Sequence, residues 1–169
     1  GMSNLGIRIL YGLMNELEGV WCERVFAPWG DMEDEMRREG LPLYGLESGD
    51  PIADFDVIGF SLGYEMAYTN VLNMLDLAGL PLRSEDRDED MPLIIAGGTC
   101  AYNPEPLAPF VDIFSLGEGE DVTVELIALS RRARREGWQR CELLAAAARI
   151  PGLYIPSLYR ITYREDGVV

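Results

Sequence analysis

The sequence contains no histidine and no lysine, and all 14 of its basic side chains are arginines. Without histidine the chain has no imidazole base, no Ser-His-Asp triad and no histidine ligand for a metal. Without lysine it lacks the residue that binds phosphates in P-loops and the residue that forms Schiff bases. These absences argue against an independent hydrolase or phosphotransferase, and they also exclude a phosphorylated receiver domain, which needs a lysine.

Cysteine is scarce, and Cys22, Cys100 and Cys141 are scattered along the chain. None forms a CxxC pair or the CxxxCxxC spacing of an iron–sulfur site. An odd number of cysteines without a secretory signal indicates a reducing, cytoplasmic compartment. We interpret Cys22 and Cys141 as core thiols. Cys100 follows a Gly-Gly turn, and both a buried structural role and a place in a pocket stay open for it.

Long apolar runs are also absent, so the sequence predicts no membrane span. The formal net charge of −15 repels phosphate backbones and anionic lipid, which argues against nucleic-acid or membrane binding by this domain alone. Hydrophobic residues make up 48% of the 169 residues and charged residues 25%, proportions that are typical of one globular domain.

Strand-like and helix-like segments alternate along the chain, which predicts βαβ units and an α/β fold with a mainly parallel sheet. Helical spacing indicates helices over residues 2–18, 31–39, 65–78 and 138–149, and a long helix with Val122, Leu126, Leu129 and Ala133 on its apolar face. Strands are expected at residues 21–28, 43–46, 56–62, 93–96, 112–116 and 153–163. We interpret the charged stretch 84–90 as a surface loop without function.

Three of the expected strands end in loops of small or polar residues. In an open parallel sheet these loops share one edge, where ligands bind. Glycines let a bulky ligand approach the backbone, although they also serve simple strand-to-helix turns. The predicted site residues are Ser61, Leu62, Gly63, Gly97, Gly98, Thr99, Gly117, Glu118 and Gly119. A flavin phosphate stays possible at this edge, but the acidic residues at 118, 120 and 121 oppose it.

Several long stretches resemble the N-terminal region of a radical SAM protein family of unassigned reaction. They are GMSNLGIRILY, CERVFAPWGDME, FSLGYEMAYTNVLNMLDLAGLPLR, IAGGTCAYNPEPLA and GEGE, and the similarity spans residues 1 to about 165. The pattern of a Ser-x-Leu type segment followed by a Gly-Gly turn also resembles cobalamin-binding domains. The resemblance implies a Rossmann-like, doubly wound, cobalamin-binding-like sheet of flavodoxin-type strand order in residues 1–150, with residues 151–169 as an exit strand and hairpin.

In that family a radical SAM barrel follows, and its CxxxCxxC motif holds a [4Fe–4S] cluster and S-adenosylmethionine. The motif is absent from this sequence. The resemblance therefore implies an accessory domain that has that barrel as its partner. Its cobalamin site would be degenerate or free of histidine, because the cobalamin-binding signature DxHxxG, whose histidine binds cobalt, has no counterpart here. The alternative is a non-catalytic interaction or scaffold domain with a vestigial pocket. An open cleft between the Ser61 and Gly97 loops would favour the cobalamin site. A pocket filled by Tyr64, Tyr68 or Tyr102 would favour the scaffold domain.

The first strand of the expected sheet is missing from this sequence, which begins at the helix that should follow that strand. Without the missing strand, segments 21–28 and 56–62 lose their shared neighbour, and their backbone groups lose partners at about 1–3 kcal/mol for each buried group. Three remedies exist: direct pairing of the two segments, insertion of residues 153–163, or pairing with another copy. We predict a homodimer or an exchanged C-terminal segment, with the helix at 2–18 still packed on the sheet.

Overall fold

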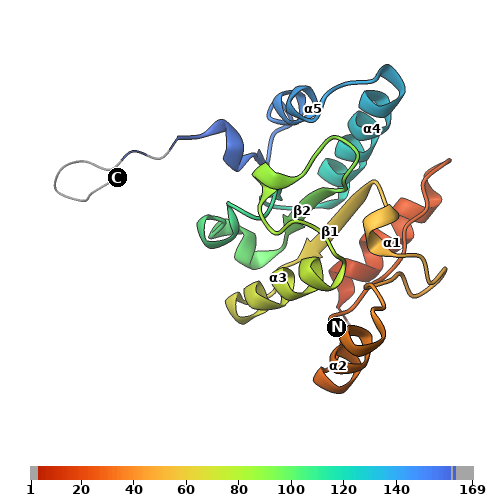
Figure 1. Cartoon of the computed structure of the whole chain (residues 1–169). Helices are drawn as coiled ribbons and strands as arrows, with labels where there is room; N and C mark the ends of the chain where they lie inside the picture. The colour runs from red at the N-terminus through yellow and green to blue at the C-terminus, as the bar shows by residue number, and fades with distance from the viewer. Residues whose placement is uncertain (1–3, 161, 163–169) are drawn as a thin grey trace.

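The computed structural model describes residues 4–160 and 162, and this part forms an α/β domain with a four-stranded sheet (Figure 1). Strands β1 (Val57–Ser61), β2 (Leu93–Gly97) and β3 (Ile113–Ser115) are parallel, and β4 (Leu153–Tyr154) runs antiparallel to β3. The strand order is β1-β2-β3-β4. The predicted class, an α/β domain with a mainly parallel sheet, is confirmed.

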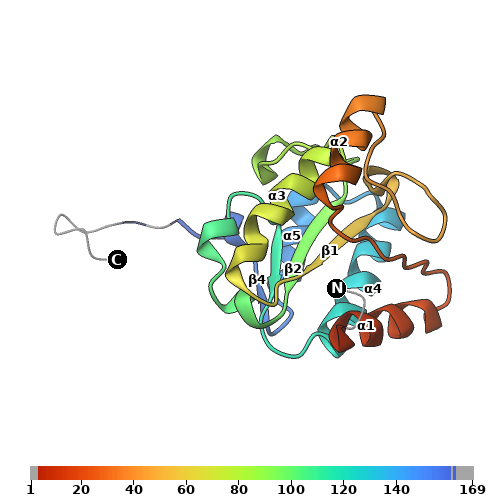
Figure 2. The ribbon, with the colours of Figure 1, turned by 90° about the horizontal axis from the view of Figure 1, so that it is seen from below.

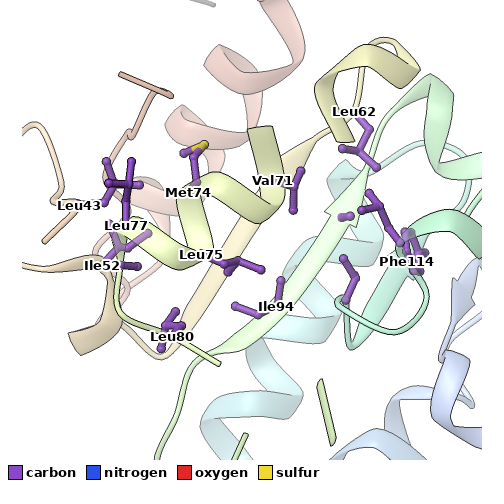
Figure 3. Packing of buried hydrophobic residues seen from close by; sticks show 14 of the residues in the cluster. Leu43, Ile52, Leu62, Val71, Met74, Leu75, Leu77, Leu80, Ile94 and Phe114 are labelled. Carbon is purple, nitrogen blue, oxygen red and sulfur yellow. The ribbon is translucent and has the colours of Figure 1, made fainter. Parts of the chain in front are cut away.

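Helices cover both faces of this sheet. Helix α3 (Tyr68–Leu77) covers one face, where Val71, Met74 and Leu75 share a core cluster with the β-strand side chains of Ile94 and Phe114 (Figure 3). Helices α4 (Glu120–Glu136) and α5 (Arg140–Ala147) cover the other face, and the members of this second cluster are Leu93, Ile113, Leu126, Leu144, Ala147 and Ile155. Successive strand residues alternate between the faces, so burial on both faces requires the apolar runs of β2 and β3.

Helices α1 (Leu5–Glu16) and α2 (Gly30–Glu39) precede the sheet. Asn4 is the N-cap residue of α1, and its side-chain oxygen accepts a hydrogen bond from the Ile7 N–H at 3.1 Å. Against the prediction that it packs on the sheet, α1 packs against α4, and its buried Met14 belongs to neither core cluster. The physical reason is that α4 already covers that face. No helix in the described ranges has both the length and the apolar composition to cross a membrane.

Three strand predictions need correction. Residues 21–28 form no strand; the N–H of Arg24 donates to the Glu47 carboxylate and its C=O accepts from Leu46, so a loop uses the groups that a ladder would need. Residues 43–46 contribute only a single bridge between Tyr44 and Pro51. Within the described part of the strand predicted at 153–163, only β4 forms, and a 3₁₀ turn follows at Pro156–Leu158 because proline has no N–H for the ladder. The hairpin at 166–167 lies outside the described residues.

Tyr154 of β4 is held by a carboxylate. Its hydroxyl donates to Glu105 Oε1 at 2.7 Å, and its ring packs against Phe114 and Tyr159. Burial and the Glu105 carboxylate raise the pKa of Tyr154 to about 12. Burial also raises the pKa of Tyr68, so we expect two tyrosines to ionise late in an absorbance titration and Tyr154→Phe to remove one of the two. The stabilisation is complete below pH about 10, the ordinary pKa of tyrosine, and is lost as the pH rises through about 12. An unchanged number of late-ionising tyrosines in Tyr154→Phe would contradict this assignment.

Candidate functional site at the carboxyl edge of the sheet

The loops after β1, β2 and β3 lie at one edge of the sheet because these strands are parallel and in register. We name residues 61–63 loop 1, residues 97–99 loop 2 and residues 117–119 loop 3. The structure thus places all nine predicted site residues at this edge. They differ in exposure: Ser61, Gly63, Gly98, Thr99, Gly117 and Glu118 are exposed, Gly97 and Gly119 are half-buried, and Leu62 is buried in the core.

Loops 1 and 2 contact each other directly. The Leu62 N–H donates to the Gly97 carbonyl at 2.7 Å, and the Leu62 carbonyl accepts from the Cys100 N–H at 3.0 Å. The Thr99 hydroxyl donates to the Gly63 carbonyl at 3.2 Å. Hydrogen bonds therefore join loops 1 and 2, and they use the hydroxyl of Thr99, one of the predicted site residues.

Gly98 is glycine because the two loops approach so closely. Its φ is +103°, and a Cβ built there would lie 2.8 Å from the Leu62 carbonyl oxygen. Only glycine combines that backbone conformation with that contact. The Gly-Gly turn thus has a packing explanation that requires no ligand.

Loop 3 leads into α4. Gly119 is the N-cap residue of α4, and Glu120 and Asp121 occupy the first turn. These carboxylates complement the positive end of the helix dipole, and with the exposed Glu118 they make this helix start unsuitable for an anion. The Tyr102 hydroxyl lies 3.8 Å from where a Cβ of Gly117 would be, which brings the segment after loop 2 to loop 3.

Aromatic and apolar side chains are exposed around these loops. Tyr64 is 58% exposed, Met66 82% and Tyr102 69%. Tyr68 anchors the segments that carry them, since its hydroxyl lies 2.9 Å from the Cys100 carbonyl and 3.0 Å from the Asn103 carbonyl. We call Tyr64, Met66 and Tyr102 the carboxyl-edge patch. An anchored backbone that presents three large apolar side chains is typical of a contact surface.

Neither metal ligands nor reactive thiols converge in the described ranges. No three side chains of His, Cys, Asp or Glu type are grouped there to hold a metal ion. Burial raises the pKa of Cys22, and the Glu47 and Glu23 carboxylates add to the shift, so this thiol is not activated. Cys141, predicted as a core thiol, is exposed, because the short helix α5 turns Leu144 and Ala147 inward instead.

The opposite, amino-terminal edge of the sheet holds a buried ionic cluster that sequence reasoning missed. Asp112, just before β3, accepts hydrogen bonds at Oδ2 from the Ile94 N–H at 2.7 Å, from Arg140 at 2.8 Å and from Arg87 at 3.3 Å. Burial raises the pKa of Asp112, while the Arg140 and Arg87 guanidiniums act against that shift. We call Asp112, Arg87 and Arg140 the Asp112 cluster.

The Asp112 cluster ties distant segments together. Arg87 also donates to the Phe110 and Leu82 carbonyls, and Arg140 donates to the Met91 and Pro92 carbonyls. The stretch 84–90 is therefore more than a solvated loop, since the Arg87 side chain is 0% exposed. The cluster lies at the edge where ligands do not bind in this class of sheet, so its role is structural. The signal available in the sequence was Asp112 itself, a single aspartate that lies between apolar residues just before a strand.

Comparison with known proteins identifies a family to which this chain is similar. The family described as radical SAM proteins, N-terminal, matches residues 6–156. An uncharacterized protein of Methanocaldococcus jannaschii is 34% identical over 96 residues, which are 56% of this chain and 20% of that relative. The match thus spans about a fifth of the relative's length. No solved structure matches the chain.

Proposed function

The chain belongs to the family of radical SAM protein N-terminal domains, and we propose that it acts there as an accessory docking domain. In this proposal the carboxyl-edge patch contacts the radical SAM barrel of the same protein. The [4Fe–4S] cluster and S-adenosylmethionine, which the family implies for the parent protein, belong to that barrel. This domain supplies no catalytic residue, and it works in the cytoplasm.

The observation that carries the proposal is the exposure of Tyr64, Met66 and Tyr102 on a backbone that is fixed by Tyr68. Tyrosine and methionine are enriched in the buried centres of interfaces. Tyr64 and Met66 follow loop 1, and Tyr102 follows loop 2, at the edge that faces a partner or ligand in Rossmann-like sheets. We accordingly extend the proposal to a doubly wound, cobalamin-binding-like fold of flavodoxin-type order.

A cobalamin site without histidine is the other candidate at this edge. The small residues after three parallel strands favour it, and Ser61, Thr99 and the loop glycines would contact the corrin. The contacts between loops 1 and 2 oppose it. The Leu62 carbonyl accepts from Cys100 and the Thr99 hydroxyl donates to Gly63, so these loop groups are already paired within the domain. Because they are not free to bind a cofactor, we favour docking.

Hydrogen exchange tests the docking proposal. In the full radical SAM protein, amides of residues 64–68 and 99–103 should exchange at least about tenfold more slowly than in the isolated chain, a factor that corresponds to about 1.4 kcal/mol. The double variant Tyr64→Ser/Tyr102→Ser should lose this protection. Trp29→Ser, which removes another exposed aromatic at 86% exposure, should retain it.

Equal exchange of these amides in the isolated chain and in the full protein would contradict docking. Hydroxocobalamin titration of the isolated chain separates the two candidates. We expect an unchanged visible spectrum and no retention of the cofactor on gel filtration. A bound cobalamin with a shifted spectrum would contradict the preference for docking and would support cobalamin binding.

A further inference from the structure

The outer edge of β1 has hydrogen-bonding groups without partners. The Asp56 carbonyl accepts from Leu93, and the Leu62 N–H donates to Gly97, so the even-numbered residues of this stretch face β2. Backbone groups alternate in direction along a strand, which turns those of Val57, Gly59 and Ser61 outward. Among residues 4–160 and 162, none of these outward groups has a hydrogen-bond partner.

The composition of β1 is that of an interior strand. Its residues are Val-Ile-Gly-Phe-Ser, without the charge, lysine or proline that protects natural sheet edges. Yet Gly59 and Ser61 are exposed and Ile58 and Phe60 only half-buried, whereas Leu93, Ile94 and Ala96 of β2 are fully buried. β1 is thus an interior strand by sequence that lies at an edge.

Two neighbouring segments also have unpaired backbone groups or exposed apolar side chains. The Val25 side chain packs against the same core cluster as Ile58 and Phe60, but its N–H and C=O have no partner within the described residues. On α1, Leu5 is 68% exposed and Ile9, one turn later, 41%. Figures 1 and 2 both place α1 and its connection to α2 on the β1 side of the sheet, away from β4. Unpaired backbone and uncovered apolar side chains therefore gather on one side of β1.

The described residues do not supply the strand that β1 lacks. The segment 21–28 does not pair with β1, and β4 pairs with β3, at the other end of the sheet. A strand beside β1 would meet the core cluster on one face and the Leu5–Ile9 stripe on the other. Both its faces would be apolar, as in interior strands of parallel sheets.

We propose that the outer edge of β1 accepts one extended, apolar strand, parallel to β1 and supplied by another part of the same radical SAM protein. The relative from Methanocaldococcus jannaschii extends far beyond the matched region, which is 20% of its length. A donor strand in the same polypeptide has an effective concentration in the millimolar range or above. A second copy lacks that advantage, and it adds another net charge of −15.

Exchange of the β1 amides tests this proposal independently of docking, because it concerns a different edge of the sheet. In the dilute isolated chain, the Ile58 and Phe60 amides should be protected, and the Val57 and Gly59 amides, which lie away from loop 1, should exchange fast. In the full radical SAM protein, the Val57 and Gly59 amides should slow by at least about tenfold. Equally fast exchange there would overturn the proposal. Protection that depends on protein concentration and accompanies a dimeric mass would assign the edge to a second copy, and would overturn it too.

A pair of substitutions at Gly59 supplies a matched control. Gly59→Pro removes the outward N–H and keeps the backbone groups that face β2, but its ring also fixes φ at about −65°. It should therefore lower the melting temperature of the full protein more than that of the isolated chain. Gly59→Ala keeps that N–H, and its Cβ would lie in ordinary contact 3.6 Å from Ile95, so it should leave the full protein unchanged. Equal effects of the two substitutions in the full protein would count against a strand at this edge.

Among residues 4–160 and 162 no strand lies on the outer side of β1, so in the isolated chain the homodimer predicted from the sequence would use this edge at high concentration. Light scattering should then give a dimeric mass for the isolated chain and a monomeric mass for its Gly59→Pro variant. A dimer that survives Gly59→Pro would place the contact between copies elsewhere.

Discussion

Replacing Asp112 with alanine is expected to lower the free energy of unfolding by about 3–5 kcal/mol, the cost of breaking a buried ion pair by removing one partner. One carboxylate oxygen of Asp112 accepts from both Arg87 and Arg140, whose side chains are 0% and 12% exposed. Without it, two guanidiniums stay inside the protein with no counter-charge, and the Ile94 N–H loses its acceptor.

Urea denaturation measures this loss, with Asp76→Ala as the matched control. Asp76 also pairs with an arginine, Arg37, at 2.8 Å, but the two side chains are 55% and 44% exposed. Exposed pairs of this kind contribute about 0–1 kcal/mol. Asp112→Asn should fall between the two, because the amide oxygen still accepts from Ile94 while the charge is gone. Equal losses for Asp112→Ala and Asp76→Ala would show that the Asp112 cluster does not stabilise the fold.

Gly98→Ala is expected to cost about 2–4 kcal/mol, from a disfavoured backbone conformation and from overpacking. The φ of +103° is one that L-residues rarely adopt, and the new methyl would meet the Leu62 carbonyl oxygen at 2.8 Å. The nearest atoms to this methyl belong to the Leu62 backbone, so no side-chain rotation relieves the clash. The substitution should also loosen the contact of loops 1 and 2.

Gly63→Ala is the control for Gly98→Ala, because it lies in loop 1 with no atom within 4 Å of its Cβ position. We expect Gly63→Ala to be neutral or to stabilise slightly through the unfolded chain. Denaturant midpoints of the two variants give the comparison. Similar midpoints would show that the close contact of Gly98 with Leu62 does not stabilise the fold.

Local patterns in the sequence predicted most of the elements. Helical spacing located α1, α2, α3, α4 and α5, and the apolar runs located β1, β2 and β3, because each pattern reports which faces of a short segment are buried. Residues 21–28 have the alternation of a strand and form none. A strand also needs a partner at its edge, and alternation contains no information about whether that partner is present.

The candidate site was predictable in position but not in content. Parallel strands bring their carboxyl ends to one edge, so the placement of loops 1, 2 and 3 followed from the strand assignments. The contact of Gly98 with Leu62 could not be predicted in this way, since glycine occurs both in ligand-binding loops and where two backbone segments pack closely. The Asp112 cluster escaped prediction for a related reason: Arg87 lies in a run of charges whose other members are exposed, and only the tertiary fold distinguishes it.

The strand order β1-β2-β3-β4 has a consequence for synthesis on the ribosome. Each strand pairs with the one made just before it, so the sheet can grow in the direction of translation without waiting for a distant segment. Helix α4 emerges after β3 and can close the second face while α5 and β4 are still in the exit tunnel. The bond of Arg140 to Asp112, across 28 residues, can form only after that step, and it would lock a sheet that has already assembled.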